Sequence, residues 1–187
     1  GFTDKARRQA QSNVTSLREA IVDKGIPVLA TSSTCTFTLR DEYPHLLDVD
    51  NTGLREHIEL ATRFLWRKLD GGQTLPLGKL PLKVVYHTPC HMEKMGWSLY
   101  TLELLRLIPG LELTVLDSRC CGIAGTYGFK RENYETSQAI GAPLFRQIEE
   151  SGADIVVTDC ETCKWQIEMS TSKRCEHPIS LLAKALG

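Results

Sequence analysis

The segment Ile155-Val156-Val157-Thr158-Asp159-Cys160-Glu161-Thr162-Cys163 joins an apolar, β-branched run to two closely spaced cysteines. The run predicts a short buried strand over residues 153–159, and a helix is expected to follow at residues 163–169. Two more predicted strands end in the same way. The strand at residues 82–87 leads to Cys90, and the strand at 111–116 leads to the adjacent pair Cys120 and Cys121.

Outward from this segment, strand and helix patterns alternate along the chain. A fourth strand is expected at residues 26–31. Helices are expected at residues 3–24, 54–69, 90–107 and 132–150, and a strand-to-helix piece at residues 178–186. Strands that alternate with helices indicate βαβ units. The sequence therefore predicts an α/β fold of tandem Rossmann-like repeats with mostly parallel sheets.

An internal repeat supports this division. With an offset of 127 residues, the sequence pairs Gly1-Phe2 with Gly128-Phe129, Gln11 with Gln138, Leu17 with Leu144, Ile21 with Ile148, Gly25 with Gly152, and Thr31 with Thr158. Residues 1–70 are then the C-terminal part of a first repeat, 71–80 a linker, and 81–187 a complete second repeat. We expect the first repeat to be truncated and the chain to begin inside a first domain.

The first repeat is degenerate where the second carries its closely spaced cysteines. Ser32-Ser33-Thr34-Cys35 stands in place of Cys160-x-x-Cys163, so that one cysteine is missing.

Composition excludes several classes of function. The chain of 187 residues has 22 basic and 23 acidic side chains and a net charge of −1, and this balance does not favour nucleic-acid binding. No apolar run approaches the roughly 20 residues that span a bilayer, and the N-terminus lacks the apolar core of a signal peptide. Association with a membrane would therefore come through a partner or a surface contact.

Seven cysteines are many for such a chain, and the number is odd. A disulfide framework would leave one thiol unpaired and needs an oxidising compartment, so metal ligation explains the count better. In an open parallel sheet, ligands collect beyond the carboxyl ends of the strands, which brings distant cysteines to one pocket. The spacing Cys160-x-x-Cys163 suits a metal, a cluster edge or a reactive dithiol. The adjacent pair Cys120-Cys121, followed by Gly122, suits a multi-iron cluster better than one zinc ion.

The pattern Cys90 … Cys120-Cys121-Gly122 … Cys160-x-x-Cys163 resembles the cysteine-rich, or CCG, domain. That family includes iron–sulfur subunits of heterodisulfide reductase, of glycolate- and lactate-oxidising systems, and of anaerobic glycerol-3-phosphate dehydrogenase. Residues 155–170 look most like the last group. The resemblance implies that five cysteines hold a non-cubane [4Fe–4S] cluster; they are Cys90, Cys120, Cys121, Cys160 and Cys163. Preparation of the protein in air can remove such a cluster.

The resemblance also implies a role. The chain would be an electron-transfer subunit without catalysis of its own, which takes electrons from flavin-containing dehydrogenase subunits and passes them to membrane quinone. It would lie in the cytoplasm, peripheral on the inner face of the cell membrane, held there through its complex.

Alternatives to an electron-transfer function stay open at this point. The chain could be an anchoring or assembly module with zinc as a structural staple, or a thiol–disulfide enzyme acting through Cys160 and Cys163. Cys35 and Cys175 fit ordinary buried cysteines that pack as small apolar residues. His87 and His91 flank Cys90; either could orient a ligand or relay a proton, or simply be hydrogen-bonded at a strand end.

Overall fold

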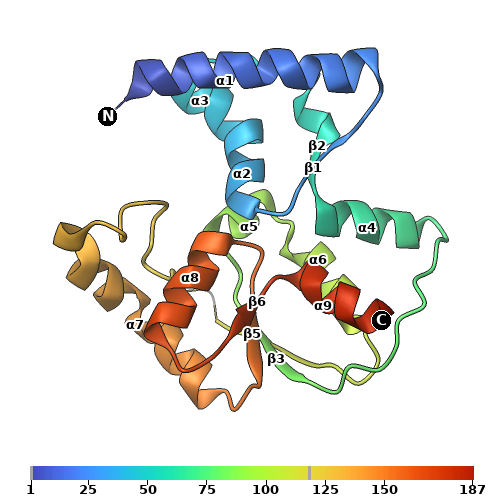
Figure 1. Cartoon of the computed structure of the whole chain (residues 1–187), viewed down its shortest axis with the longest axis vertical. Helices are drawn as coiled ribbons and strands as arrows, with labels where there is room; N and C mark the ends of the chain where they lie inside the picture. The colour runs from blue at the N-terminus through green and yellow to red at the C-terminus, as the bar shows by residue number, and fades with distance from the viewer. Residues whose placement is uncertain (1, 118) are drawn as a thin grey trace.

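A computed structural model describes residues 2–117 and 119–187, and in it helices alternate with short parallel strands (Figure 1). Gly1, which the sequence repeat pairs with Gly128, lies outside the described residues. The first half of the chain contains α1 (Thr3–Arg18), η1 (Glu19–Asp23), β1 (Val28–Ala30), α2 (Ser33–Phe37), η2 (Thr38–Glu42), α3 (Tyr43–Leu47), η3 (Arg55–His57), β2 (Ile58–Leu60) and α4 (Ala61–Asp70).

The second half follows a stretch without regular secondary structure. It contains β3 (Lys83–Tyr86), α5 (Cys90–Met95), α6 (Ser98–Arg106), β4 (Glu112–Val115), η4 (Arg131–Asn133), α7 (Tyr134–Glu150), β5 (Ile155–Val157), α8 (Glu161–Ser170), β6 (Cys175–Glu176) and α9 (Pro178–Leu186).

Each half builds its own parallel sheet. In the first half β1 pairs with β2, and in the second half the strand order is β4-β3-β5-β6. Every pairing is parallel. The predicted α/β class with parallel sheets is therefore confirmed.

The two halves share one repeated unit. The 127-residue offset carries β1 onto β5 strand for strand, and each strand follows a left-handed glycine, Gly25 with φ +66° and Gly152 with φ +65°. In both halves a helix precedes this strand, another helix follows it, and a second parallel strand and a last helix complete the unit. The order α1-β1-α2-β2-α4 thus follows the order α7-β5-α8-β6-α9, with η2, α3 and η3 inserted between α2 and β2 in the first half.

The structure corrects several element boundaries. The helix expected at residues 54–69 begins only at Ala61, because Ile58–Leu60 forms β2, whose three residues are all buried. Buried residues at positions 54 and 58 fit a helical period as well as they fit a buried strand. The helix expected at residues 90–107 is divided in two at Gly96, which adopts a left-handed φ of +68°. The segment 178–186 is helical throughout.

Four of the cysteines are packed into the hydrophobic core of the second half. Cys121, Cys160, Cys163 and Cys175 belong to a buried cluster that also holds Val156, Ile148 and Ile167.

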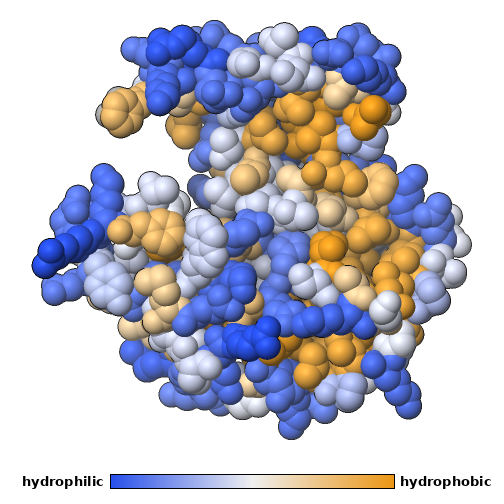
Figure 2. Space-filling model, viewed as in Figure 1, coloured by the Kyte–Doolittle hydropathy of each residue, from blue (hydrophilic) through white to orange (hydrophobic). Residues whose placement is uncertain are grey.

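The outer face of α1 is largely hydrophilic, as Figure 2 shows, and this helix buries only Ala10 and Val14. Among the described residues, no helix combines the length and the apolar character that crossing a bilayer requires.

Candidate metal centre

A cavity of about 440 Å³ lies beyond the carboxyl ends of β3 and β5. Cys160 is the residue that precedes α8 and Cys163 lies in its first turn, while Cys90 begins α5. The cysteine pair lies on the loop that follows β4. The structure thus brings the five cysteines of the sequence pattern to one cavity, whose lining is Thr34, Glu42, Pro89, Cys90, His91, Cys120, Cys121, Ile123, Ala124, Gly125, Cys160, Thr162 and Cys163.

The five thiols divide into a buried wall and an open rim. Cys121, Cys160 and Cys163 are at most 5% exposed, whereas Cys90 and Cys120 are exposed. All seven cysteines of the chain are free thiols. A bound group would therefore be held against a dry interior on one side and would face solvent on the other.

The thiols lie close enough to perturb one another. Sγ of Cys121 is 3.3 Å from Sγ of Cys163, and the backbone N–H of Gly122 donates to Sγ of Cys120 at 3.3 Å. Sγ of Cys160 lies 3.2 Å from the hydroxyl of Thr162 and 3.5 Å from the hydroxyl of Thr34.

These contacts separate the thiol pKa values. Interaction with Cys163, helped by the hydroxyls of Thr162 and Thr34, lowers the pKa of Cys160 to about 5. Hydrogen bonding to Cys120 and then to Cys163 holds the pKa of Cys121 far below its ordinary range. The same contacts raise the pKa of Cys120 and of Cys163 above the ordinary thiol value. The lowered pKa values of Cys160 and Cys121 favour their thiolate forms, and the thiolate is the form that binds metals.

The remaining thiol of the five behaves differently. Partial desolvation at the cavity rim raises the pKa of Cys90 above its ordinary value, and the charges of Cys121 and Cys160 add to this effect. Proximity to other thiolates disfavours a further negative charge unless a cation compensates for it.

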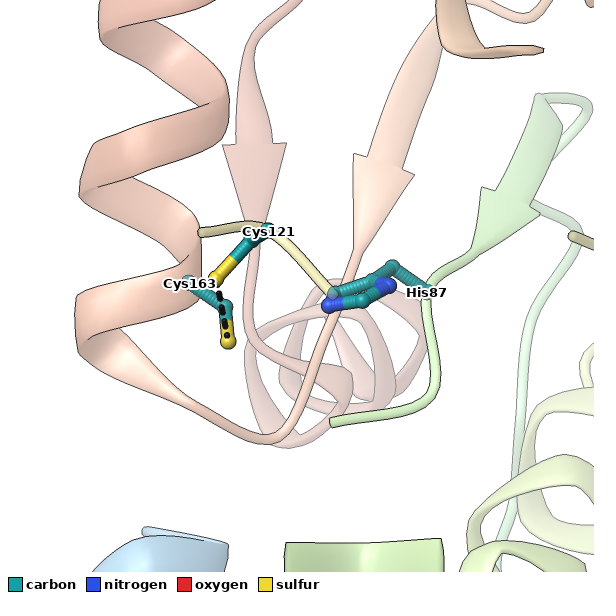
Figure 3. Close-up of side chains that lie close together, drawn as sticks. All are labelled: His87, Cys121 and Cys163. Atoms are coloured by element: carbon teal, nitrogen blue, oxygen red, sulfur yellow. Dashed lines mark hydrogen bonds between the residues drawn. The ribbon is translucent and has the colours of Figure 1, made fainter. Parts of the chain in front are cut away.

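His87 joins the buried wall at the end of β3. Its ring is 2% exposed, and Nε2 has no hydrogen-bond partner among the described residues. Ligand atoms of His87, Cys121 and Cys163 all lie within 4.8 Å of one another, and Figure 3 shows the three side chains gathered at this point. A buried polar atom without a partner carries a free-energy cost, which a bound group would relieve.

The cysteine pair is clamped to the helices behind it. Gly122 has φ +87°, and a Cβ at this position would overlap the carbonyl oxygen of Ser137. The Ser137 hydroxyl donates to the carbonyl of Gly122 at 2.9 Å and accepts from the Gln166 amide at 2.9 Å. This close approach to α7 requires glycine and fixes the loop that presents both thiols.

A buried polar network supports the other cysteine loop. The Asp159 side chain is fully buried and accepts from the Tyr86 hydroxyl at 2.6 Å and from the Thr101 hydroxyl at 3.1 Å. Thr62 of the first half lies 3.5 Å away, and the backbone N–H of Ser33 donates to the Asp159 carbonyl at 2.9 Å. Burial raises the pKa of Asp159 above its ordinary value. The residue that precedes Cys160 is thus tied to both halves of the chain.

The corresponding loop of the first half carries hydroxyls. The offset that aligns β1 with β5 places Ser33 at the position of Cys160 and Thr36 at the position of Cys163, and both are fully buried. The expectation that only one cysteine is missing, with Cys35 in place of Cys163, is therefore wrong, because hydroxyl residues stand at both positions. Cys35 aligns with Thr162 and does not line the cavity. It is exposed, so the prediction of an ordinary buried cysteine is wrong at this position. Cys175 is buried in the core, and burial raises its pKa to about 12.

Sequence reasoning missed Thr34 and Glu42, which line the cavity although both belong to the first half. Thr34 belongs to the degenerate segment 32–35, and neither residue is a sequence neighbour of the five cysteines, so the sequence does not mark them as part of the site.

Comparisons with known proteins agree with the cysteine geometry. Residues 84–168 match the family described as "Cysteine-rich domain", CCG. The whole chain is 84% identical to a subunit of the anaerobic glycerol-3-phosphate dehydrogenase of Escherichia coli (strain K12), and covers 47% of that protein. It is 30% identical to lactate utilization protein A of Bacillus velezensis over 86% of this chain and 67% of that protein.

A third relative is more distant. The chain is 27% identical to a subunit of the dihydromethanophenazine:CoB–CoM heterodisulfide reductase of Methanosarcina barkeri, over 98% of this chain and 46% of that protein. The chain thus spans about half the length of the first and the third of these relatives. Because the matched domain contains all five cysteines and the similarity to all three relatives extends over most of the chain, the chain belongs to the cysteine-rich domain family, CCG.

Proposed function

We propose that the five cysteines hold an iron–sulfur cluster and that the protein passes electrons through it. The observation that carries the proposal is the convergence of five thiols from three strand ends on one cavity of about 440 Å³. Thiolates are the protein ligands of such clusters, and the cluster supplies reversible one-electron transfer when it is bound. The low pKa of Cys160 and Cys121 provides thiolates at neutral pH.

The donor set favours a cluster over a single ion. A structural zinc site takes four ligands in a tetrahedron, and five thiols around a cavity of this size exceed that need. Adjacent thiols on one loop suit an extended group with several metal atoms. We propose the non-cubane [4Fe–4S] type on this ground and on the family resemblance.

The chain's own residues have separate tasks in this proposal. Cys121, Cys160 and Cys163 hold the buried side of the group, and Cys90 and Cys120 close the exposed side. The apolar packing behind them excludes water from the buried sulfurs. Exposure of the rim leaves a short path by which an electron enters or leaves.

We further propose that the whole protein serves a glycerol-3-phosphate dehydrogenase complex. The 84% identity to a subunit of the Escherichia coli enzyme supports this assignment. Flavin-containing subunits would then deliver the electrons, and membrane quinone would accept them at the inner face of the cell membrane.

A second candidate is a zinc-stapled anchoring or assembly module. The three ligand atoms of His87, Cys121 and Cys163 within 4.8 Å of one another favour it, because zinc accepts a mixture of imidazole and thiolate. This candidate leaves Cys90 and Cys120 without a role.

Anaerobic reconstitution with iron and sulfide separates the two candidates. We expect a brown protein with about four irons and four sulfides per chain and broad visible absorption. Cys121→Ser should lose most of the iron, while Cys35→Ser, whose thiol lies outside the cavity, should keep it. A colourless protein that binds one zinc ion tightly and takes up no iron and sulfide would overturn the cluster proposal in favour of the zinc module.

The place in the complex needs a separate experiment. The full-length protein, assembled with flavin-containing dehydrogenase subunits, should show a reduced cluster signal in EPR after glycerol 3-phosphate is added. Oxidation of that signal by a soluble quinone would support the acceptor, and an unchanged signal at both steps would contradict this assignment.

A further inference from the structure

The first half of the chain reaches into the cysteine cavity. Thr34, on α2, lines the cavity with its hydroxyl 3.5 Å from Sγ of Cys160. The same hydroxyl lies 3.1 Å from Nδ1 of His91. The His91 ring in turn stacks on Phe37, with centroids 4.8 Å apart and planes 13° from parallel. Figure 1 shows α2 descending from the first half onto α5, which carries His91.

We propose that Thr34 is a positioning residue of the cluster site, which donates a hydrogen bond to the Cys160 sulfur and raises the reduction potential of the bound cluster. The inference rests on the proposed cluster function and deepens it. It assigns to the first half, which lacks the second half's closely spaced cysteines, a role in setting the redox properties of the site.

The number of available protons fixes the direction of these hydrogen bonds. A metal-bound thiolate has no proton, so the Thr34 hydroxyl must be the donor to Cys160. A hydroxyl has a single proton, so its contact with His91 must then be accepted from Nδ1–H. The chain of donors therefore runs from His91 through Thr34 to the Cys160 sulfur, and the stacking on Phe37 fixes the ring that begins it.

A hydrogen-bond donor at this position affects the reduction potential of the cluster. Hydrogen bonds to ligand sulfurs are one of the factors that set the potential of iron–sulfur clusters. The positive end of the O–H dipole stabilises the reduced state, which carries one more negative charge than the oxidised state. Because Cys160 is only 3% exposed, little water is present to screen the effect. Removal of the hydroxyl should therefore lower the potential.

The chain offers a matched control on the same helix. Thr36 is fully buried and its hydroxyl donates to the Ser32 carbonyl at 2.9 Å, not to a cysteine. The backbone N–H of Thr36 donates to that same carbonyl at 3.0 Å, so the carbonyl keeps a partner when the hydroxyl is removed. Thr36→Val therefore removes an equivalent hydroxyl at a point where no sulfur is affected.

The test compares the reconstituted wild-type chain with Thr34→Val, Thr34→Ser and Thr36→Val. Midpoint potentials are measured by EPR-monitored redox titration, and iron–sulfur stretching frequencies by resonance Raman spectroscopy. We expect Thr34→Val to have a lower potential and shifted iron–thiolate frequencies. Thr34→Ser, which restores the donor, and Thr36→Val should match the wild type. Loss of the cluster from Thr34→Val but not from Thr34→Ser would support the contact equally.

Three results would overturn the inference: an unchanged potential in Thr34→Val, an equal shift in Thr34→Ser, or an equal shift in Thr36→Val. Failure of the proposed function is distinguishable, because the wild-type chain itself would then take up no cluster. That result would overturn both proposals, whereas a wild-type cluster with unchanged variants would overturn this one alone.

Discussion

The loops that follow β1 and β5 share a backbone and differ in chemistry. Both follow a strand at the same position of the repeat and a left-handed glycine just before it. The loop after β5 presents Cys160 and Cys163, and the loop after β1 buries Ser33 and Thr36 at the same positions. The comparison teaches that the fold does not require the thiols. The first half forms the same strand-and-loop arrangement with hydroxyls at these two positions.

The loop after β1 has a different task, which is to support its counterpart. The Ser33 backbone N–H donates to the Asp159 carbonyl at 2.9 Å. Nε2 of His177 lies 2.7 Å from the Thr31 carbonyl, and Nδ1 of the same ring accepts from the N–H of Ile179 at the start of α9. Nε2 therefore joins the two halves beside the cysteines, while the bond at Nδ1 fixes the ring within the second half.

The largest effect is expected at Gly122, which lies against α7. Among the described residues of the first half, no glycine is in such tight contact with another helix. Gly122→Ala places a Cβ against the Ser137 carbonyl and keeps an unfavourable φ of +87°. Strain and overpacking together should lower the free energy of unfolding by roughly 3 kcal/mol or more. Urea denaturation of the metal-free protein measures this loss.

The matched control for this change is Gly125→Ala. Gly125 has φ +66° and nothing lies within 4 Å of the methyl group that alanine would add, so only the backbone strain of about 1–2 kcal/mol applies. Equal losses in the two variants would show that the contact with Ser137 does not hold the cysteine loop.

A second prediction uses ionisation to separate the two loops. In the metal-free protein the Cys160 thiolate should form as pH rises through about 5, because its pKa lies well below the ordinary thiol value of 9.0. The ultraviolet absorbance of the thiolate should therefore show a step near pH 5 in the wild type that is missing from Cys160→Ser.

The control for that titration is a thiol introduced at the equivalent position of the first half. A thiol introduced by Ser33→Cys has Thr36 where Cys160 has Cys163, and burial disfavours its charge. It should ionise at a higher pH than Cys160 does. Ionisation of both thiols at the same pH would mean that the fold, and not the neighbouring cysteine, lowers the pKa.

A third prediction concerns Asp159, which aligns with Ser32 of the first half. Asp159→Asn offers one acceptor oxygen where the carboxyl group accepts from Tyr86 and Thr101 through separate oxygens. The variant should lose about 1–3 kcal/mol of unfolding free energy. Ser32→Ala, at the aligned position, should cost less.

The pH dependence of this loss has a defined sign. Burial raises the pKa of Asp159 in the folded state above its ordinary value of 3.8. The folded wild type therefore loses stability as pH rises from that ordinary value toward the raised pKa, since the unfolded chain ionises first. The asparagine side chain does not titrate, so the gap between wild type and variant should narrow as pH rises. A widening gap in denaturation experiments would contradict the raised pKa.

The smallest effect tests the shared backbone itself. Gly25 and Gly152 occupy equal positions with φ +66° and +65°, and neither has an atom within 4 Å of an added Cβ. Each change to alanine should cost about 1 kcal/mol, and the two costs should agree. Melting temperatures of the two variants measure this, and a clear difference would break the equivalence of the two units.

The sequence predicts much of the fold because strands and cysteines coincide in the second half. The expected strands at residues 82–87, 111–116 and 153–159 contain β3, β4 and β5. The sequence does not predict strand β2, because Ile58 falls on the same helical period as Ala61, Leu65 and Leu69 of α4. Nor does it predict the short strand Cys175–Glu176, since two residues carry no period.

The residues of the candidate site likewise fall into those that the sequence predicts and those that it does not. Local spacing is enough to single out the cysteines, and a strand end marks His87. The contact of Thr34 with Cys160 joins residues 126 positions apart, and no pattern within one sequence carries such a pairing. Only the packing of α2 on α5 reveals it.

Asp159 links the contact between the two halves to the cysteine cavity, so the free energies of the two are coupled. Its carboxyl group is gripped by β3 and α6, its main-chain oxygen by the first half, and its next neighbour is Cys160. Binding of a group that stabilises the Cys160 loop should therefore also stabilise the contact between the halves. By reciprocity, separating the halves should lower the affinity of the site for the bound group. Slow amide exchange at Ser33 would then report loading of the cavity from outside it.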